Sequence, residues 1–160
     1  MIGRDFAKAP AAWLRISTPS GDAVLSSPPS FAPIKGDPGS VSTAVVGGTG
    51  NVVAYLNVTP QQGGERRHGF GAFRASLLRH DHDYAVHVDA VAEGLAFNGG
   101  VGSCVIDDYL TRVGNNPYRE IACLVVGRHG GTVVVATAAG ASWSLYRQTL
   151  REAVASITVS

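Results

Sequence analysis

The chain has 160 residues, a formal net charge of +1, 45% hydrophobic residues and 16% charged residues. This length suits a single domain over residues 1–160, and the composition excludes a disordered chain. A net charge so close to zero provides no basic field for nucleic acid, and no apolar run reaches the ~18 residues of a transmembrane helix. We therefore expect a globular domain with no nucleic-acid partner and no transmembrane segment.

Two features of the sequence give opposite indications of the cellular compartment. Residues 1–8 lack the apolar core, roughly 7–15 residues long, of a signal peptide. A disulfide between the two cysteines would instead indicate an oxidising compartment. We expect a cell-envelope or extracellular protein if the cysteines pair and a precursor segment preceded this chain, and a cytoplasmic protein otherwise. Frequent Ala, Gly, Val and Arg, with Lys only at positions 8 and 35, is typical of a GC-rich bacterial genome, such as that of an actinobacterium.

The first part of the chain predicts short strands around a proline-rich segment. Residues 11–17 form a short strand pattern, and residues 19–40 contain prolines at positions 19, 28, 29, 33 and 38. Because proline cannot donate to a strand ladder, we expect this segment to be an irregular surface connection or a sheet edge. The β-branched runs 41–46 and 52–58 then predict a hairpin.

The glycine segment Gly47-Gly48-Thr49-Gly50-Asn51 between these two runs has two interpretations. After a strand it resembles a dinucleotide-binding turn, in which a third glycine lets a helix pack closely and point its N-terminus at the pyrophosphate. The position of that third glycine is Val53, and the residues after it favour a strand. The hairpin turn is therefore the preferred interpretation, and nucleotide binding by an enzyme at Gly47–Gly50 is the alternative.

A helix and a strand are predicted next, with a polar junction between them. Residues 63–80 carry Phe70, Phe73 and Leu77 at helical spacing, and residues 84–96 alternate as in a strand. The junction His80-Asp81-His82-Asp83 contains residue types that bind Zn²⁺. No other histidine has ligand spacing, so we interpret the junction as a solvated loop and expect no metal site.

Two apolar runs at 102–113 and 118–126 flank the turn-rich residues 114–117 and predict a second hairpin. If Cys104 faces Cys123, the same register places Ile106 opposite Ile121, Asp108 opposite Arg119, and Asp107 opposite Glu120. The first charged pair is favourable, and we interpret Asp108 and Arg119 as a structural pair rather than a ligand site. The second pair brings two carboxylates together. If the turn is instead the four residues 114–117, the cysteines are offset by four positions.

Cys104 and Cys123 therefore have two main interpretations, a disulfide across the hairpin or two reduced core residues. The spacing does not favour a redox pair, because such pairs are close in sequence or adjacent to histidine. A bridge closing about 20 residues would stabilise the fold by roughly 3 kcal/mol.

The last elements are a strand at 132–137 and a helix at 142–157. Trp143, Tyr146, Leu150 and Val154 recur at helical spacing and predict a core-facing stripe. Strands and helices in this order predict an α+β fold in which helices sandwich an antiparallel sheet.

This order of elements also resembles a known family. The hairpin from residue 102, the strand at 132–137 and the helix from Ala141-Ser142-Trp143 to Ala155-Ser156-Ile157 resemble the end of PsbP-like domains. The resemblance covers mainly residues 41–160. Within this family, the chain is similar to actinobacterial surface lipoprotein-type members. Members of that family are mostly non-enzymatic photosystem subunits, a small-GTPase partner, secretion chaperones and mycobacterial surface lipoproteins. The resemblance implies a binding domain and supplies no catalytic residue.

We therefore predict a non-enzymatic binding or accessory module, with no catalytic residue, no cofactor and an unknown protein or small ligand as its partner. The serines have no Gly-x-Ser-x-Gly frame for a nucleophile. The alternatives are a cytoplasmic adaptor or chaperone for one protein, and the nucleotide-binding enzyme described above.

Overall fold

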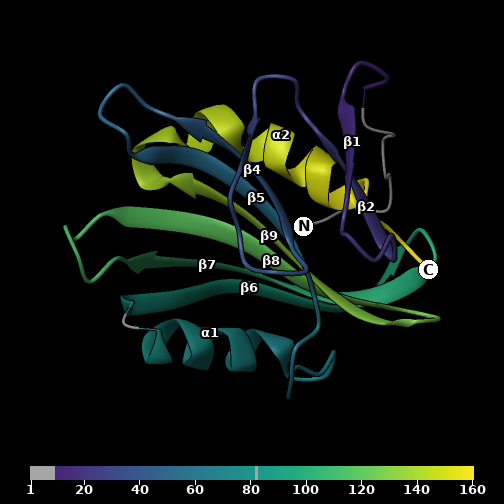
Figure 1. Cartoon of the computed structure of the whole chain (residues 1–160). Helices are drawn as coiled ribbons and strands as arrows, with labels where there is room; N and C mark the ends of the chain where they lie inside the picture. Colours follow the sequence, from purple (N-terminus) through teal and green to yellow (C-terminus); the bar gives the residue numbers. More distant parts are fainter. Residues whose placement is uncertain (1–9, 82) are drawn as a thin grey trace.

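The computed structural model describes residues 10–81 and 83–160. Within these ranges the chain forms two antiparallel sheets and two α-helices, a mixed α/β fold (Figure 1). None of the helices in the described ranges is long and apolar enough to cross a membrane.

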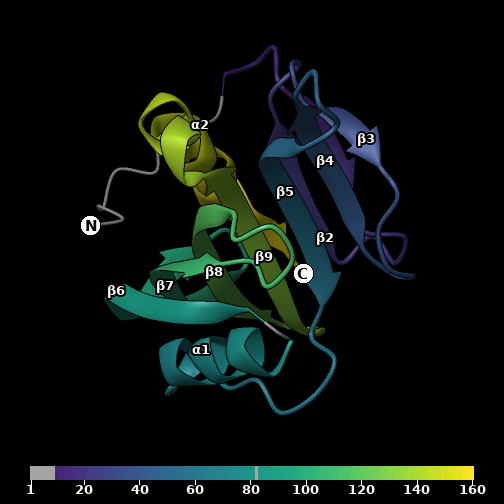
Figure 2. The same cartoon turned by 90° about the vertical axis from the view of Figure 1, so that its left-hand side faces the viewer.

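The larger sheet has seven strands in the order β3-β4-β5-β9-β8-β7-β6, and each strand is antiparallel to its neighbours. The strands are β3 Ala32–Ile34, β4 Val41–Val46, β5 Val52–Pro60, β6 Tyr84–Phe97, β7 Gly100–Leu110, β8 Pro117–Gly127 and β9 Gly130–Ala139. All neighbours except β5 and β9 are consecutive in the chain, so hairpins build most of the sheet. The sheet twists strongly, and β3 to β5 turn away from β6 and β7 (Figure 2).

The two helices lie on opposite faces of this sheet. Helix α1, Phe70–His80, packs against β6, β7 and β8, while α2, Trp143–Ala155, packs against β8 and β9 on the other face (Figure 1). Helices cover strand β8 on both faces, which explains why a long run of this strand is apolar and buried, whereas α2 covers β9 on one face only. Helix α1 begins later than the sequence predicts, because Gly69 adopts a left-handed backbone conformation (φ 76°) immediately before it. The amide of Gly69 donates to Glu93 of β6 at 2.8 Å.

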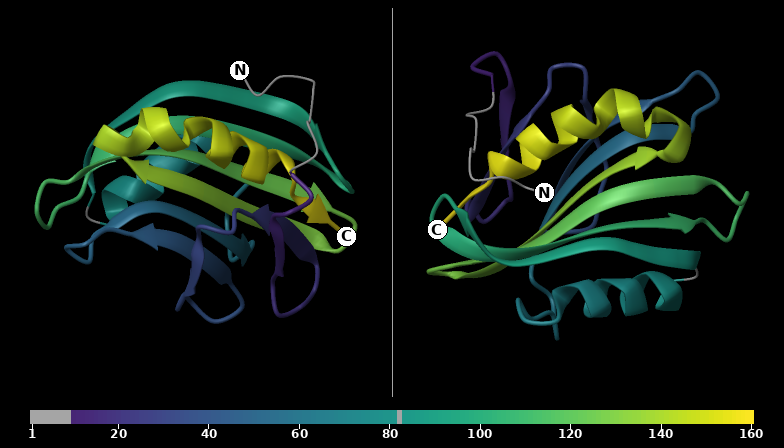
Figure 3. Two further views of the ribbon diagram at one scale, coloured as in Figure 1. Left: turned by 90° about the horizontal axis from the view of Figure 1, so that it is seen from above. Right: turned by 180° about the vertical axis from the view of Figure 1, so that it is seen from behind.

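A second sheet of three strands joins the two ends of the described chain. It has the order β1-β2-β10, formed by β1 Leu14–Ser17, β2 Ala23–Ser27 and β10 Thr158–Val159. The C-terminus therefore lies beside the N-terminal strands (Figure 3).

The proline-rich segment at 19–40 is more regular than we expected, because it contains β2 and β3. Strand β2 contains no proline and occupies the centre of its sheet. Strand β3 contains Pro33 and lies at a sheet edge, where a missing amide donor costs little.

Two groups of buried side chains form the core on either face of the large sheet. The group under α2 includes Leu56, Ile121, Leu150 and Ile157, which are all fully buried. The smaller group under α1 is centred on Phe70, which is 1% exposed. The two faces thus have separate cores, and α1 has fewer buried partners than α2.

Strand β6 departs from the regular alternation predicted for residues 84–96. Its pairing with β7 is interrupted at three places, between Tyr84 and His87, Val88 and Ala90, and Ala92 and Leu95. Such bulges are frequent in edge strands, where they disfavour pairing with another chain.

Candidate functional site

The β7–β8 hairpin has the predicted register, with Cys104 opposite Cys123. A disulfide joins these cysteines, their Cα atoms are 4.1 Å apart, and both residues are buried. Of the two interpretations of the cysteines, the structure contains the disulfide. The strands end at Leu110 and Pro117, so the connecting loop is six residues long and the four-residue turn is wrong.

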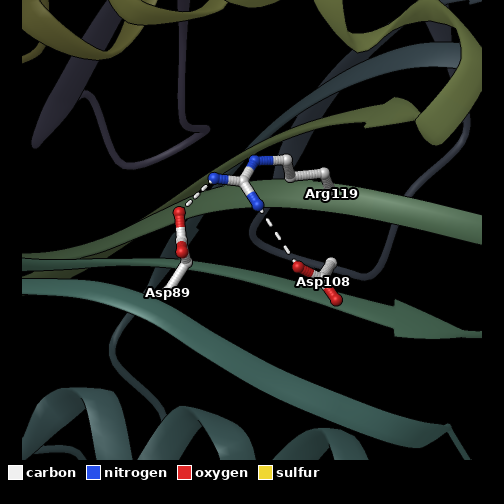
Figure 4. Close-up of polar contacts among 3 residues, drawn as sticks. All are labelled: Asp89, Asp108 and Arg119. Atoms are coloured by element: carbon white, nitrogen blue, oxygen red, sulfur yellow. Dashed lines mark hydrogen bonds and ion pairs between the residues drawn. The ribbon is translucent and has the colours of Figure 1, made fainter.

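Arg119 links three elements on the α2 face of the sheet. Its guanidinium donates to Asp108 of β7 at 3.2 Å and forms a second ion pair with Asp89 of β6 (Figure 4). The hydrogen bond from Arg119 lowers the pKa of Asp89. The guanidinium also lies over the Trp143 ring, 5.4 Å from its centroid. These contacts connect the start of α2 to three strands and give the guanidinium of Arg119 two carboxylate acceptors and one aromatic neighbour.

Two buried carboxyl groups lie side by side on the opposite face. Asp107 of β7 faces Glu120 of β8, and both residues are 0% exposed. Arg74 of α1 donates to both oxygens of Glu120, at 3.2 and 2.9 Å. Neither oxygen of Asp107 accepts a hydrogen bond from a donor in the described part of the chain, and its carboxyl group interacts with that of Glu120.

These three groups cannot all be charged and also balance, because one guanidinium faces two carboxyl groups. Burial, followed by the proximity of Glu120, raises the pKa of Asp107 from 3.8 to about 8. At neutral pH Asp107 is therefore protonated, and Glu120 and Arg74 form an ion pair. Burial alone would lower the pKa of Arg74, but Glu120 raises it, so the guanidinium stays charged.

A groove of about 460 Å³ runs beside this ion pair, between α1 and the neighbouring strands. We call it the α1 groove. Its floor is formed by side chains of β5 and β9 that face α1, namely Tyr55, Asn57, Thr59, Val133 and Val135. One wall is the side of α1 that carries Phe70, Phe73, Arg74 and Leu77. The groove exists because α1 packs on β6 to β8 and leaves the β5–β9 part of this face open.

The rim of the α1 groove is polar and largely acidic. Asp37 follows β3, Glu65 precedes α1, and Asp81 follows it. Gln62 completes the rim. The oxygen of the Asn57 side chain is buried and accepts no hydrogen bond within the described residues, although Asn57 lines the groove. The groove thus combines apolar side chains of α1 and β9 with polar side chains of β5, carboxylates and an unpaired acceptor, which suits it to binding a hydrogen-bond donor.

The other sequence candidates do not form a site. Gly47 and Gly50 lie in the turn between β4 and β5, where the Gly47 amide donates to the Asn51 carbonyl at 2.8 Å, and a strand follows instead of a helix. His80 and Asp81 form an exposed pair at the end of α1, while His82 lies outside the described residues. No group of three His, Cys, Asp or Glu side chains in the described ranges is placed to hold a metal ion.

The side chains of the apolar stripe on α2 differ in how deeply they are buried. Leu150 and Val154 are 0% and 1% exposed, whereas Trp143 and Tyr146 are partly buried at the edge of the same core. Tyr146 makes an edge-to-face contact with Phe31, a residue of the proline-rich segment. The stripe covers the sheet and the N-terminal strands together.

Sequence reasoning did not find the α1 groove or the role of Arg74. Phe70, Phe73 and Leu77 were predicted as an apolar stripe, but Phe73 and Leu77 are only partly buried and line the groove. The lining residues come from separate segments of the chain, so only the strand order could have brought them together. The unfavourable pairing of Asp107 with Glu120 was the one feature of the sequence that pointed to this region of the structure.

The sequence matches no protein-family model and no curated protein. Among solved structures, the cyanobacterial PsbP protein (CyanoP) from Synechocystis sp. PCC 6803 is similar, with a TM-score of 0.66 and 13% identity over 95% of each chain. A protein of unknown function and putative regulator, PA94 from Pseudomonas aeruginosa, has a TM-score of 0.56 and 8% identity over 89% of this chain and 93% of that chain. LpqN, involved in cell envelope biogenesis of Mycobacterium tuberculosis, has a TM-score of 0.45 and 12% identity over 95% of this chain and 80% of that chain. The likeness to CyanoP confirms the PsbP-like fold.

Proposed function

We propose that this protein is a non-enzymatic binding module whose partner occupies the α1 groove. The observation that carries this proposal is the groove itself, an open cavity of about 460 Å³ lined by both apolar and polar side chains, with a polar rim. Cavities of ~300–1,000 Å³ with this mixture of surfaces are typical binding sites. Arg74 and Glu120, which lie beside the groove, are engaged with each other, which supports a structural rather than a catalytic role for this pair.

The proposed location is the cell envelope. The disulfide between Cys104 and Cys123 supports an oxidising compartment, because cytosolic thiols are kept reduced. Thiol labelling of the protein in intact cells of its native organism tests this location. We expect no labelling before reduction. Two reactive thiols in freshly quenched, denatured cells would support a cytoplasmic adaptor instead.

Site-specific photocrosslinking tests the groove as the binding surface. A photoreactive phenylalanine analogue replaces Gln62, which is exposed on the groove rim, or Gln148, which is exposed on α2. We expect a discrete covalent adduct in the native organism from position 62 and none from position 148. Filling the floor with Val135→Trp should remove the adduct while the melting temperature is retained. An adduct from position 148 alone would place the binding surface on α2 and contradict the proposal.

A further inference from the structure

We infer that the α1 groove binds a peptide segment of a partner protein in which Lys or Arg lies next to apolar residues. This inference rests on the proposed function, because it assigns a chemistry to the partner in the same groove. It follows from three properties of the groove: the partly exposed apolar side chains that line it, the sign of the net charge of its lining residues, and the spacing of its carboxylates.

The apolar part of the groove calls for apolar side chains in the partner. Val135 on β9, and Phe73 and Leu77 on α1, line the groove and remain partly exposed. Covering these side chains removes apolar surface from water, which is the main favourable term in association. A purely ionic partner would leave this surface exposed.

The charge of the lining residues is negative. Asp37, Glu65 and Asp81 contribute three carboxylates, and Arg74 contributes one guanidinium. Both carboxylate oxygens of Glu120 accept from Arg74 at the back of the groove, so its charge is already compensated. The neighbouring Arg66 and Arg67 are exposed and do not line the groove. A cationic group therefore complements the rim, and its N–H groups match the unpaired acceptor of Asn57.

The spacing of the carboxylates favours a chain segment over a single small cation. The segment before α1 that carries Glu65 lies beside Phe73, where a Cβ atom on Gly64 would be 4.0 Å from the ring, while Asp81 directly follows the helix. The helical residues between Phe73 and Asp81 span roughly 12 Å, which exceeds the reach of one amine. An extended segment of about four residues spans the same distance. A segment that alternates basic and apolar residues would place one face on the floor and the other at the rim.

Three matched peptides test the inference. Each is a capped seven-residue peptide in which Val alternates with Lys, Gln or Glu, titrated into ¹⁵N-labelled protein and followed by the amide signals of Val133 and Val135. We expect the Lys peptide to bind at least tenfold more tightly than the Gln peptide, and the Glu peptide to bind least. The affinity of the Lys peptide should fall as salt rises, because exposed charges are screened.

A charge-neutralised variant provides the second test. We expect Asp37→Asn, Glu65→Gln and Asp81→Asn together to weaken the Lys peptide about tenfold, since each exposed ion pair contributes a roughly two- to threefold factor. The matched control is Asp22→Asn, an exposed carboxylate on the turn between β1 and β2, which should leave the affinity unchanged.

The outcomes separate the partner's chemistry from the proposed function. Equal binding of the Lys and Gln peptides in the groove would overturn the cationic class and leave the groove as the binding site. Binding of hexylamine as tightly as the Lys peptide would overturn a peptide partner in favour of a small organic cation. Failure of all three peptides to shift the groove signals, together with adducts only from position 148, would overturn both the inference and the proposed function.

Discussion

At the scale of single residues, the least ordinary feature is the placement of two carboxyl groups and one guanidinium under α1. Asp107 and Glu120 are fully buried, and only Glu120 is paired with Arg74. A second buried charge without a partner would be costly, so Asp107 keeps its proton. The three groups therefore carry no net charge at neutral pH, and this balance depends on pH.

We predict that replacing Asp107 with Asn changes how stability depends on pH. The pKa of Asp107 rises from 3.8 in the unfolded chain to about 8 in the fold, so the folded state binds more protons between these values. The free energy of unfolding of the wild type should therefore fall as pH rises from about 4 to about 8, by up to about 1.4 kcal/mol per pH unit. Asp107→Asn removes this titration. Urea unfolding at several pH values should show that the free energy of unfolding of the variant, relative to that of wild type, increases from about pH 4 to about pH 8.

The neighbouring Asp108 provides the control for this prediction. It lies on the opposite face of the same strand and pairs with Arg119. Asp108→Asn should lack the rising advantage between pH 4 and pH 8. A parallel pH dependence of Asp107→Asn and wild type would show that Asp107 is ionised in the fold.

The sequence predicted part of this arrangement. The register in which Cys104 faces Cys123 also places Asp107 opposite Glu120, and the structure has this register. The pairing of two carboxyl groups is tolerated because Arg74, 46 residues before Glu120, donates to Glu120. Arg74 reaches Glu120 only because α1 packs on the sheet. Patterns within a strand or a helix carry no information on such long-range pairs, so the sequence predicted that Asp107 faces Glu120 but not that Arg74 pairs with Glu120.

At the scale of elements, the β7–β8 hairpin is held by its ladder and by one covalent bond. The disulfide closes a sequence separation of 19 residues. On the chain-entropy account this bond stabilises the fold by about 3 kcal/mol. We predict that the double variant Cys104→Ala and Cys123→Ala unfolds at lower urea by a corresponding amount, and that reduced wild type matches it. Equal stability of oxidised and reduced wild type would show that the ladder alone fixes the hairpin.

The closing helix α2 gives a second prediction at this scale. Leu150 is 0% exposed at the centre of the core, whereas Trp143 is only partly buried and packs at the edge against Arg119. Leu150→Ala should therefore cost about 2–5 kcal/mol of unfolding free energy, and Trp143→Ala should cost less than Leu150→Ala despite removing a larger side chain. The control Leu145→Ala, at a position 75% exposed, should stay within about 0.5 kcal/mol of wild type. A larger loss for Trp143→Ala in thermal or urea unfolding would contradict this ranking.

Prediction from the sequence succeeded for the long elements and for the short strand β1, which lies within the strand predicted at 11–17, and failed for the other short strands. The strands at 41–46 and 52–58, the second hairpin and the closing helix all have strong periodicity, and each is present. Strands β2, β3 and β10 have between two and five residues, which is too few for an alternation to be distinguished from a loop. Strands β2 and β3 pair with the neighbouring strands β1 and β4, whereas β10 pairs with β2 near the other end of the chain, and only the folded sheet defines all three as strands.

At the scale of the whole molecule, the C-terminal residues connect the two sheets. Strand β10 pairs with β2, while the Val159 amide donates to the Asn98 carbonyl at 2.9 Å, in the turn between β6 and β7. The Ser160 carbonyl accepts from the His129 amide at 2.9 Å, in the turn between β8 and β9. The last residues thus link the N-terminal strands to two turns of the large sheet, and they do so through backbone groups that any sequence could supply.

Gly99 makes this connection possible, and its replacement tests it. The residue has φ 82°, and a Cβ atom there would overlap the Val159 carbonyl oxygen. Gly21 has a similar φ of 79°, but a Cβ atom there would meet nothing within 4 Å. Both Gly→Ala variants incur the cost of a left-handed backbone, about 1–2 kcal/mol, whereas only Gly99→Ala adds the cost of displacing β10, about 1–3 kcal/mol. We predict that Gly99→Ala lowers the melting temperature clearly more than Gly21→Ala and increases amide hydrogen exchange at Val159 and Ser160. Equal losses in the two variants would mean that the C-terminal strand contributes little to joining the sheets.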